Sequence, residues 1–216
     1  MHFDFQKLTP AQRYKLLIGC IVPRPIALVT TRSKSGLNNA APFSFFNVFS
    51  EDPALVILGF GNRSDGTLKD TAANIAETGE FVVNLVDESI AEQMALCAID
   101  FPPDESEINP ADFTLAHSAE INVARIAEAP VSLECHKYQS IKIGDKNRTL
   151  MIGEVIHLHA REGLIDPETH YINENNYKPI GRLHRALYTK TDHRFEMPLM
   201  TYEEWCTNIS KQRVTD

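Results

Sequence analysis

Residues 42–50, with the sequence Pro-Phe-Ser-Phe-Phe-Asn-Val-Phe-Ser, combine large aromatic side chains with small hydrogen-bonding ones. In one extended strand, alternation puts Phe45 and Asn47 on one face and Ser44 and Phe46 on the other, so each face carries both kinds. A flat aromatic ligand with polar edges needs such a wall. The alternative is a barrel strand whose polar residues face solvent.

Residues 59–71 offer a candidate anion site. Arg63, Ser64 and Lys69 precede a predicted helix that starts at Asp70 and Thr71. The backbone N–H groups at a helix start, its dipole and a lysine together favour a phosphate. Thr-Leu stands where a phosphate-binding P-loop requires Lys-Ser or Lys-Thr, so the segment is not a P-loop. The alternative is a solvated turn followed by an ordinary helix cap.

A polar residue, Asn84, interrupts the apolar stretch of residues 80–86. Asn is depleted in strands, and a buried amide must be hydrogen-bonded. The side chain is therefore expected either to fix a neighbouring loop or to meet the edge of a ligand.

Residues 179–188 bring positive charge into an acidic protein through Arg182, His184 and Arg185. They form either a cationic lining for an anionic ligand or reduced cofactor, or a basic surface turn. His157 and His159 share one strand face, but they lack the cysteine or carboxylate spacing of a metal site. We therefore predict no metal site.

The elements that would position these residues are mostly short strands. Apolar, β-branched runs between turn formers predict strands at residues 26–31, 39–50, 54–60, 80–86, 131–140 and 149–159. Helices are predicted at residues 10–17, 70–78 and 89–97, with Thr9 and Asp70 as N-caps and Gly79 as a stop. Residues 101–113 are expected to form an exposed loop, and a tail that docks on another surface begins near Asp192. This density of strands favours an antiparallel sheet or barrel.

Composition excludes several classes of protein. The chain has 216 residues, 21 Lys and Arg against 29 Asp and Glu, and a net charge of −8. That balance argues against nucleic acid and against an anionic membrane surface as partners. No apolar segment is long enough to cross a bilayer, and the N-terminus lacks the pattern of a signal peptide. The four widely spaced cysteines fit reduced thiols in a cytoplasmic protein.

Seven segments, taken in order, resemble the flavin reductase-like family of FMN-binding split barrels, including its flavoredoxin-type branch. The likeness runs from about Gly19 to Tyr188. The resemblance rests on all seven segments occurring in this order, and no single motif among them is specific to the family. The segments are RPIALVTT (24–31), NAAPFSFFN (39–47), KDT (69–71), GEFVVN (79–84), PVSLEC (130–135), IGEV (152–155) and GRL (181–183).

The resemblance implies one mainly β domain over residues 1–216, with a core at about 19–188 and a C-terminal tail at 189–216. Its fold would be a six-stranded antiparallel Greek-key split barrel with flanking short helices. The family typically forms a homodimer that binds FMN near the subunit interface. Carried over by position, the expected cofactor contacts are Ser44, Phe45, Phe46, Asn47, Ser50, Arg63, Lys69, Asp70, Thr71, Asn84 and Arg182.

The expected activity is that of an oxidoreductase that transfers a hydride from NADH or NADPH to flavin N5 and passes electrons to an acceptor. The flavin supplies the chemistry, so no catalytic acid or base is assigned. Arg182 or Arg24 would stabilise the anionic reduced flavin. No Rossmann fingerprint is present, so the nicotinamide would dock directly over the flavin. The alternatives are an FMN-binding electron carrier reduced by a partner protein, a barrel used only for protein interaction, and an oxidase of pyridoxamine phosphate.

Overall fold

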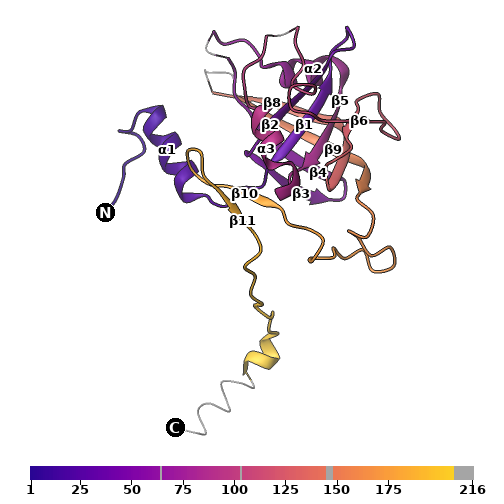
Figure 1. Cartoon of the computed structure of the whole chain (residues 1–216). Coiled ribbons are helices and arrows are strands. Elements are labelled where there is room, and N and C mark those ends of the chain that lie inside the picture. The colour runs from indigo at the N-terminus through magenta and orange to yellow at the C-terminus, as the bar shows by residue number, and fades with distance from the viewer. Residues whose placement is uncertain (64, 103, 145–147, 207–216) are drawn as a thin grey trace.

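The computed structural model describes residues 1–63, 65–102, 104–144 and 148–206 (Figure 1). Its main element is an antiparallel sheet, in agreement with the predicted mainly β fold class. The helices are α1 (Pro10–Cys20), α2 (Asp70–Thr78), the 3-10 turn η1 (Glu88–Ile90) and α3 (Ala91–Leu96). The strands are β1 (Ala27–Arg32), β2 (Asn38–Phe43), β3 (Phe46–Glu51), β4 (Ala54–Phe60), β5 (Glu80–Leu85), β6 (Leu115–Ala116), β7 (Arg125–Ile126), β8 (Val131–Ile143), β9 (Arg148–Ala160), β10 (Ile180–Arg182) and β11 (Tyr188–Lys190).

The main sheet has the strand order β2-β1-β5-β8-β9-β4-β3, so two strands that are neighbours in sequence form its opposite edges. The chain crosses from one edge to the other at Ser44 and Phe45, where the Phe45 carbonyl accepts a hydrogen bond from Gly59 N–H at 2.7 Å. A single strand over residues 39–50 was expected, and that expectation is wrong. The bend that rolls the sheet into a barrel interrupts it.

The same bend changes which aromatic side chains face inward. Phe43 packs edge-on against Phe60 inside the barrel, with ring centroids 4.7 Å apart, and Phe46 packs against the same cluster. Phe45 and Phe49 are exposed instead. Strict alternation along one strand would have placed Phe43, Phe45 and Phe49 on the same face. The bend instead shifts by one residue which side chains after it face the barrel interior.

Helix α2 closes one end of the barrel. Its Ala72 and Ile75 pack in the core cluster formed by β1, β4, β5, β8 and β9. Gly79 ends the helix in the left-handed conformation at φ 74°, as predicted. The N-cap residue, however, is Lys69 rather than Asp70, which is the first helical residue.

A second core cluster covers the outer face of β1 and extends under α3. Ile90, Met94 and Cys97 point into it, as their spacing predicted. Ile108 and Phe113 belong to the same cluster. The expectation that residues 101–113 form an exposed loop is therefore only partly correct, because part of this segment packs over Ile26 and Leu28.

Helix α1 and residues 191–206 lie outside the barrel (Figure 1). Thr9 caps α1 through a capping box with Gln12, and no α1 side chain is buried. No helix among the described residues is long and apolar enough to cross a membrane.

Candidate functional site

The start of α2 has backbone donors that its own cap does not bind. Lys69 provides the N-cap position in an extended conformation, but its side chain makes no hydrogen bond to the helix. A helix start leaves up to about four N–H groups without intrahelical partners, and its dipole favours an anion there. The predicted anion site therefore combines a lysine with a helix start that the side chain of its N-cap residue does not bind.

Charged side chains surround this helix start. Lys69 Nζ lies 3.3 Å from Asp100 Oδ1. Arg63 donates to Asp70 Oδ2 at 2.6 Å and to the Leu68 carbonyl at 2.7 Å, and this bond to Asp70 raises the pKa of Arg63. The carboxylates balance the two cations in the free protein, while Lys69 remains 45% exposed in its side chain and accessible to an external anion.

The helix start, β2 and the segment after α3 enclose a pocket of about 150 Å³, which we call the anchor pocket. Its polar side includes Thr71 Oγ1, which accepts a hydrogen bond from Asn39 Nδ2 at 3.1 Å. Four of the predicted site residues meet here, namely Arg63, Lys69, Asp70 and Thr71. The other lining residues are Asn39, Ala41, Pro42, Phe43, Cys97, Ala98, Ile99, Asp100, Phe101 and Glu107. Ser64 lies outside the described residues.

Glu107 is a buried acid in the wall of the anchor pocket. It is 7% exposed, and its Oε2 accepts a hydrogen bond from Ala40 N–H at 3.1 Å. Burial raises the pKa of Glu107, and burial with the nearby Glu107 charge raises the pKa of Cys97 to about 12. Sequence reasoning missed Glu107 because it lies in a segment interpreted as an exposed loop. It also assigned no role to Asn39, although Asn39 begins a segment that carries the family resemblance.

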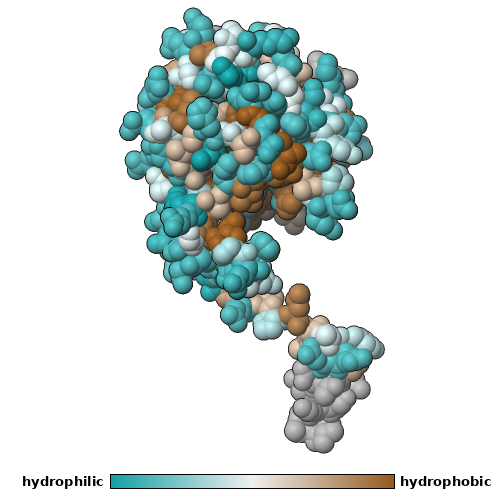
Figure 2. Space-filling model, turned by 90° about the vertical axis from the view of Figure 1, so that its right-hand side faces the viewer, coloured by the Kyte–Doolittle hydropathy of each residue, from teal (hydrophilic) through white to brown (hydrophobic). Residues whose placement is uncertain are grey.

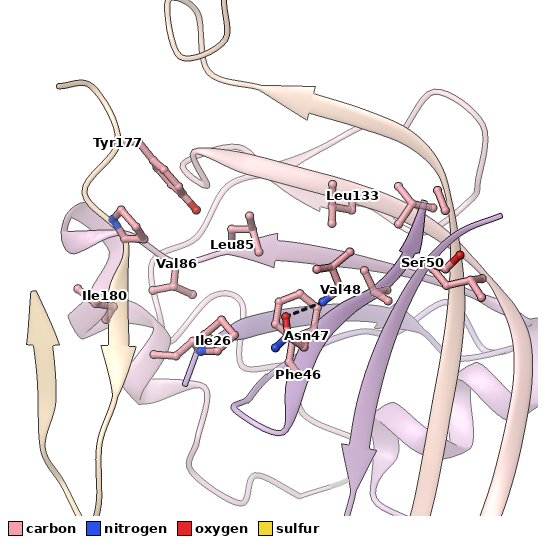
Figure 3. A pocket seen from close by; sticks show the side chains of 16 residues that line it. Ile26, Phe46, Asn47, Val48, Ser50, Leu85, Val86, Leu133, Tyr177 and Ile180 are labelled. Atoms are coloured by element: carbon pink, nitrogen blue, oxygen red, sulfur yellow. Dashed lines mark hydrogen bonds between the residues drawn. The ribbon is translucent and has the colours of Figure 1, made fainter. Parts of the chain in front are cut away.

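A second and larger pocket, of about 390 Å³, opens on the other side of the β2–β3 bend and is almost entirely apolar (Figure 3). We call it the apolar groove. Phe46, Asn47 and Ser50 line it, so the structure separates these three predicted residues from the Lys69 side chain. The other lining residues are Pro25, Ile26, Val48, Ala54, Leu55, Val56, Leu85, Val86, Leu133, Val155, Tyr177, Pro179 and Ile180.

Ser44 lies at the bend between the two pockets and contacts Arg24, whose Nε is 3.4 Å from Ser44 Oγ. The same guanidinium donates to the carbonyls of Ile18, Ile21 and Leu183 at 2.7–2.9 Å. Burial lowers the pKa of Arg24. Arg24 therefore joins the end of α1 to the segment after β10, and its donors are used within the protein.

Asn84 is fully buried in β5, and it lines neither pocket. Its Nδ2 donates to the Leu28 carbonyl at 3.0 Å, and its Oδ1 accepts from Ile126 N–H and Ser132 Oγ, both at 2.9 Å. These bonds join β1, β5, β7 and β8. Of the two roles left open for Asn84, the contacts match that of a residue that fixes a neighbouring loop.

Arg182 is also separate from the anchor pocket. Its guanidinium lies 4.4 Å from the centre of the Tyr188 ring and donates to the Arg185 carbonyl. An Arg over an aromatic ring at this distance is a cation–π contact. Within the described residues, no group of three or more His, Cys, Asp or Glu side chains is arranged to hold a metal ion.

Comparison with known proteins identifies the family. The model of the protein family described as "Flavin reductase like domain" matches residues 18–181 of this chain. The chain belongs to the flavin reductase-like family. The predicted resemblance is therefore confirmed. The fold is that of a flavin reductase split barrel, and its main sheet has one more strand than expected.

Several known proteins match this chain over most of their length. The crystal structure of 2-nitrobenzoate 2-nitroreductase NbaA from Pseudomonas fluorescens is 40% identical, with a TM-score of 0.86, and the match covers 94% of this chain and 98% of that one. Nitrilotriacetate monooxygenase component B from Bacillus cereus is 36% identical, with a TM-score of 0.87 and coverages of 91% and 98%. An uncharacterized protein from Aquifex aeolicus is 41% identical over 190 residues, which is 88% of this chain and 95% of that protein.

Proposed function

We propose that this protein is an FMN-dependent oxidoreductase that accepts electrons from NADH or NADPH and passes them to a further acceptor. The observation that carries the proposal is the helix start at Lys69, whose side chain leaves the first backbone donors of α2 without a cap. Family membership supports a flavin as the ligand, and the anchor pocket supports one that carries a phosphate.

The phosphate would bind between Lys69 and the first turn of α2. Lys69 would supply charge, the backbone N–H groups would supply directed donors, and the Thr71 hydroxyl would donate as well because its oxygen already accepts from Asn39. Arg63 would act from further away, since its guanidinium is bonded to Asp70 and Leu68. Asp100 would turn away from Lys69 as the phosphate arrives; its side chain is 92% exposed and free to move.

The ring of the flavin would extend beyond the anchor pocket. About 150 Å³ is smaller than the ~300–1,000 Å³ of typical cofactor clefts, so only the phosphate and part of the chain attached to it fit inside. The ring would follow Ala41, Pro42 and Phe43 toward the bend at Ser44 and Phe45. A second copy of the chain would cover it, in a homodimer that also buries exposed apolar residues such as Val48 and Phe49.

When bound, the flavin supplies the exchange of a hydride and of electrons. The protein's residues hold and orient it, and β2 and the segment after α3 keep water from one side of the site. The two solved relatives above are named as a nitroreductase and as a monooxygenase component, and both names fit a role in passing electrons onward.

An anaerobic titration tests this proposal. The protein, loaded with FMN, is mixed with NADH or NADPH, and the flavin absorbance near its visible maximum is followed. Rapid bleaching by either nucleotide is the expected result. A protein that binds FMN but is not bleached by either nucleotide would be an electron carrier, and a protein that binds no flavin would overturn the proposal entirely.

A further inference from the structure

Buried acids are few in this chain, although it is rich in acidic residues. The face drawn in Figure 2 is largely hydrophilic, as expected for a protein with 29 Asp and Glu. Three acidic side chains are nevertheless buried among the described residues, namely Asp87, Glu107 and Glu134. Arg161 Nη2 lies 3.2 Å from Asp87 Oδ2, and His159 Nε2 lies 2.5 Å from Glu134 Oε1. Within the part of the chain that the structure describes, Glu107 alone of the three has no basic side chain within ion-pair distance.

Glu107 lies in the wall of the anchor pocket, where the proposed flavin site does not yet use it. It is 7% exposed, and because it lines the pocket, its accessible part faces the cavity. Its Oε2 accepts a hydrogen bond from Ala40 N–H at 3.1 Å, and no other described residue donates to this carboxyl group. A buried carboxylate without a cation is disfavoured, and such a group holds a proton instead.

The two cations of the anchor pocket are already matched by two other carboxylates. Arg63 Nη2 lies 2.6 Å from Asp70 Oδ2, and Lys69 Nζ lies 3.3 Å from Asp100 Oδ1. An ionised Glu107 would therefore be a third carboxylate beside two cations. The charge balance of the pocket thus favours the neutral form of Glu107 even before a ligand arrives.

The other titratable groups that face Glu107 do not favour its charge either. Burial raises the pKa of Glu107, and the charge of Asp70 in the first turn of α2 adds to that rise. Cys97, which follows α3, stays neutral, because burial and then the Glu107 charge raise its pKa to about 12. The lining residues from β2 have no titratable side chain. On the segment of Glu107 itself, Asp104 and Glu105 are exposed to solvent.

A phosphate at the start of α2 would bring about 1.5–2 negative charges into the same pocket. The pocket measures about 150 Å³, and charges enclosed in so small a space are screened far less than charges at an open surface. A like charge nearby favours the protonated form of an acid. The phosphate therefore favours the proton on Glu107, and by reciprocity that proton favours the phosphate.

We propose that FMN binding in the anchor pocket is coupled to protonation of Glu107, so that the phosphate enters beside a neutral carboxyl group. Above the pH at which the free protein loses this proton, binding takes one proton up from solvent. The inference rests on the proposed function, because it requires a flavin phosphate in this pocket. Arg63 and Lys69 attract the anion, while Glu107 sets the pH range over which the protein holds FMN tightly. The affinity for FMN is consequently higher at low pH than at high pH.

Calorimetric titration measures this proton. FMN is titrated into the flavin-free protein at several pH values from 5.5 to 8.5, each in two phosphate-free buffers that differ in ionisation enthalpy, because the difference in heat gives the number of protons exchanged. At the upper pH values the parent protein should take up more protons than Glu107→Gln, whose amide oxygen can still accept from Ala40 N–H. The ratio of the parent Kd to the variant Kd should rise about tenfold over this range, the effect of a one-unit rise in the Glu107 pKa on binding.

The phosphate's own titration is common to both proteins, so it cancels in this ratio. A constant ratio with equal proton uptake in the two proteins would overturn the proposal. Glu105→Gln is the matched control, since it makes the same change at an exposed acid of the same segment, outside the pocket lining. It should follow the parent at every pH. A change as large as that of Glu107→Gln would reveal a general effect of charge and would also overturn the coupling.

Riboflavin separates the phosphate from the ring and needs no variant. It carries the same ring and chain without a phosphate, so its binding to the parent protein should take up fewer protons than FMN binding does. The phosphate itself does not produce the difference, because binding beside Lys69 favours its fully ionised form and would release a proton. Equal uptake with both ligands would contradict the coupling. A protein that binds no FMN at any pH would overturn the proposed function as well, whereas FMN binding that is independent of Glu107 would overturn only the coupling.

Discussion

Asn39 Nδ2 donates to Thr71 Oγ1 at 3.1 Å and thereby joins strand β2 to the first turn of α2. Both residues are buried, at 9% and 2% exposure. The bond fixes the helix start against the strand that lines the anchor pocket, and it leaves the Thr71 hydroxyl hydrogen free to be donated. Lys69, one residue before the helix, is therefore held beside a set of donors whose positions are fixed before any ligand arrives.

Lys69→Ala should weaken FMN binding by about 1.5–3 kcal/mol, the usual contribution of a hydrogen bond to a charged group. Riboflavin, which lacks the phosphate, should bind the variant and the parent protein equally well. Flavin fluorescence quenching measures both affinities, and Lys69→Arg serves as the control that keeps the charge. An equal loss for both flavins would place the phosphate elsewhere.

Arg182 provides the contrasting case. Because its guanidinium lies over Tyr188 and not in the anchor pocket, Arg182→Ala should leave FMN affinity within about twofold of the parent value. The same fluorescence titration measures it. A loss of affinity as large as that of Lys69→Ala would mean that Arg182 reaches the phosphate, which its position in a single chain does not allow.

The sequence predicted the strands and the anion site because both depend on local patterns. Apolar runs gave the strands, and the cluster of Arg63, Lys69 and a helix start gave the anion site. Two of the differences between expectation and structure arose from long-range contacts. The bend at Ser44 exists because β2 and β3 pair at opposite edges of the sheet, and Glu107 is buried because its loop packs over β1 and β2. No pattern within residues 39–50 or 101–113 encodes either contact.

Glu107→Gln should change how stability depends on pH. Burial raises the pKa of Glu107, so the folded protein holds this proton more tightly than the unfolded chain does. Its contribution to stability is complete below the ordinary glutamate pKa and is lost as the pH rises through the raised value. The glutamine can still accept from Ala40 N–H but carries no charge, so the variant should gain stability relative to the parent as the pH rises from 4 to 8.

Chemical denaturation at several pH values measures this effect, and Glu105→Gln, an exposed acid in the same segment, is the matched control. The control should follow the parent protein at every pH. A constant difference in unfolding free energy between Glu107→Gln and the parent across this range would mean that the carboxyl has the same pKa in both states.

Asn84→Ala should destabilise the barrel without touching the anchor pocket. It leaves Ile126 N–H, the Ser132 hydroxyl and the Leu28 carbonyl short of a partner in the interior, and each such group costs about 1–3 kcal/mol. Urea denaturation should show the loss. Asn47→Ala, an exposed asparagine in β3, should change stability by less than about 0.5 kcal/mol. If Asn84→Ala were as stable as that control, the network would contribute nothing.

Glu134→Gln should remove a stabilising contribution that disappears in acid. Glu134 is completely buried in β8, and burial alone would raise its pKa. His159 Nε2 at 2.5 Å and the N–H groups of Ala119 and Glu120 at 2.6 and 2.9 Å outweigh that effect and hold the pKa of Glu134 below its ordinary value. The unfolded chain therefore takes up this proton first as the pH falls. The stabilisation is complete above the ordinary glutamate pKa and is lost as the pH falls through the lowered value.

At pH 7 the substitution should therefore cost about 1.5–3 kcal/mol, the contribution of hydrogen bonds to a charged group. Denaturation at pH 7 and at pH 3 measures it, with Glu120→Gln as an exposed control from the loop that Glu134 holds. The difference between parent and variant should shrink at pH 3, because the unfolded parent chain takes up the proton at a higher pH than the folded protein does. A difference that stayed the same at both pH values would mean that the shape of the side chain, rather than its charge, holds residues 119 and 120 against the sheet.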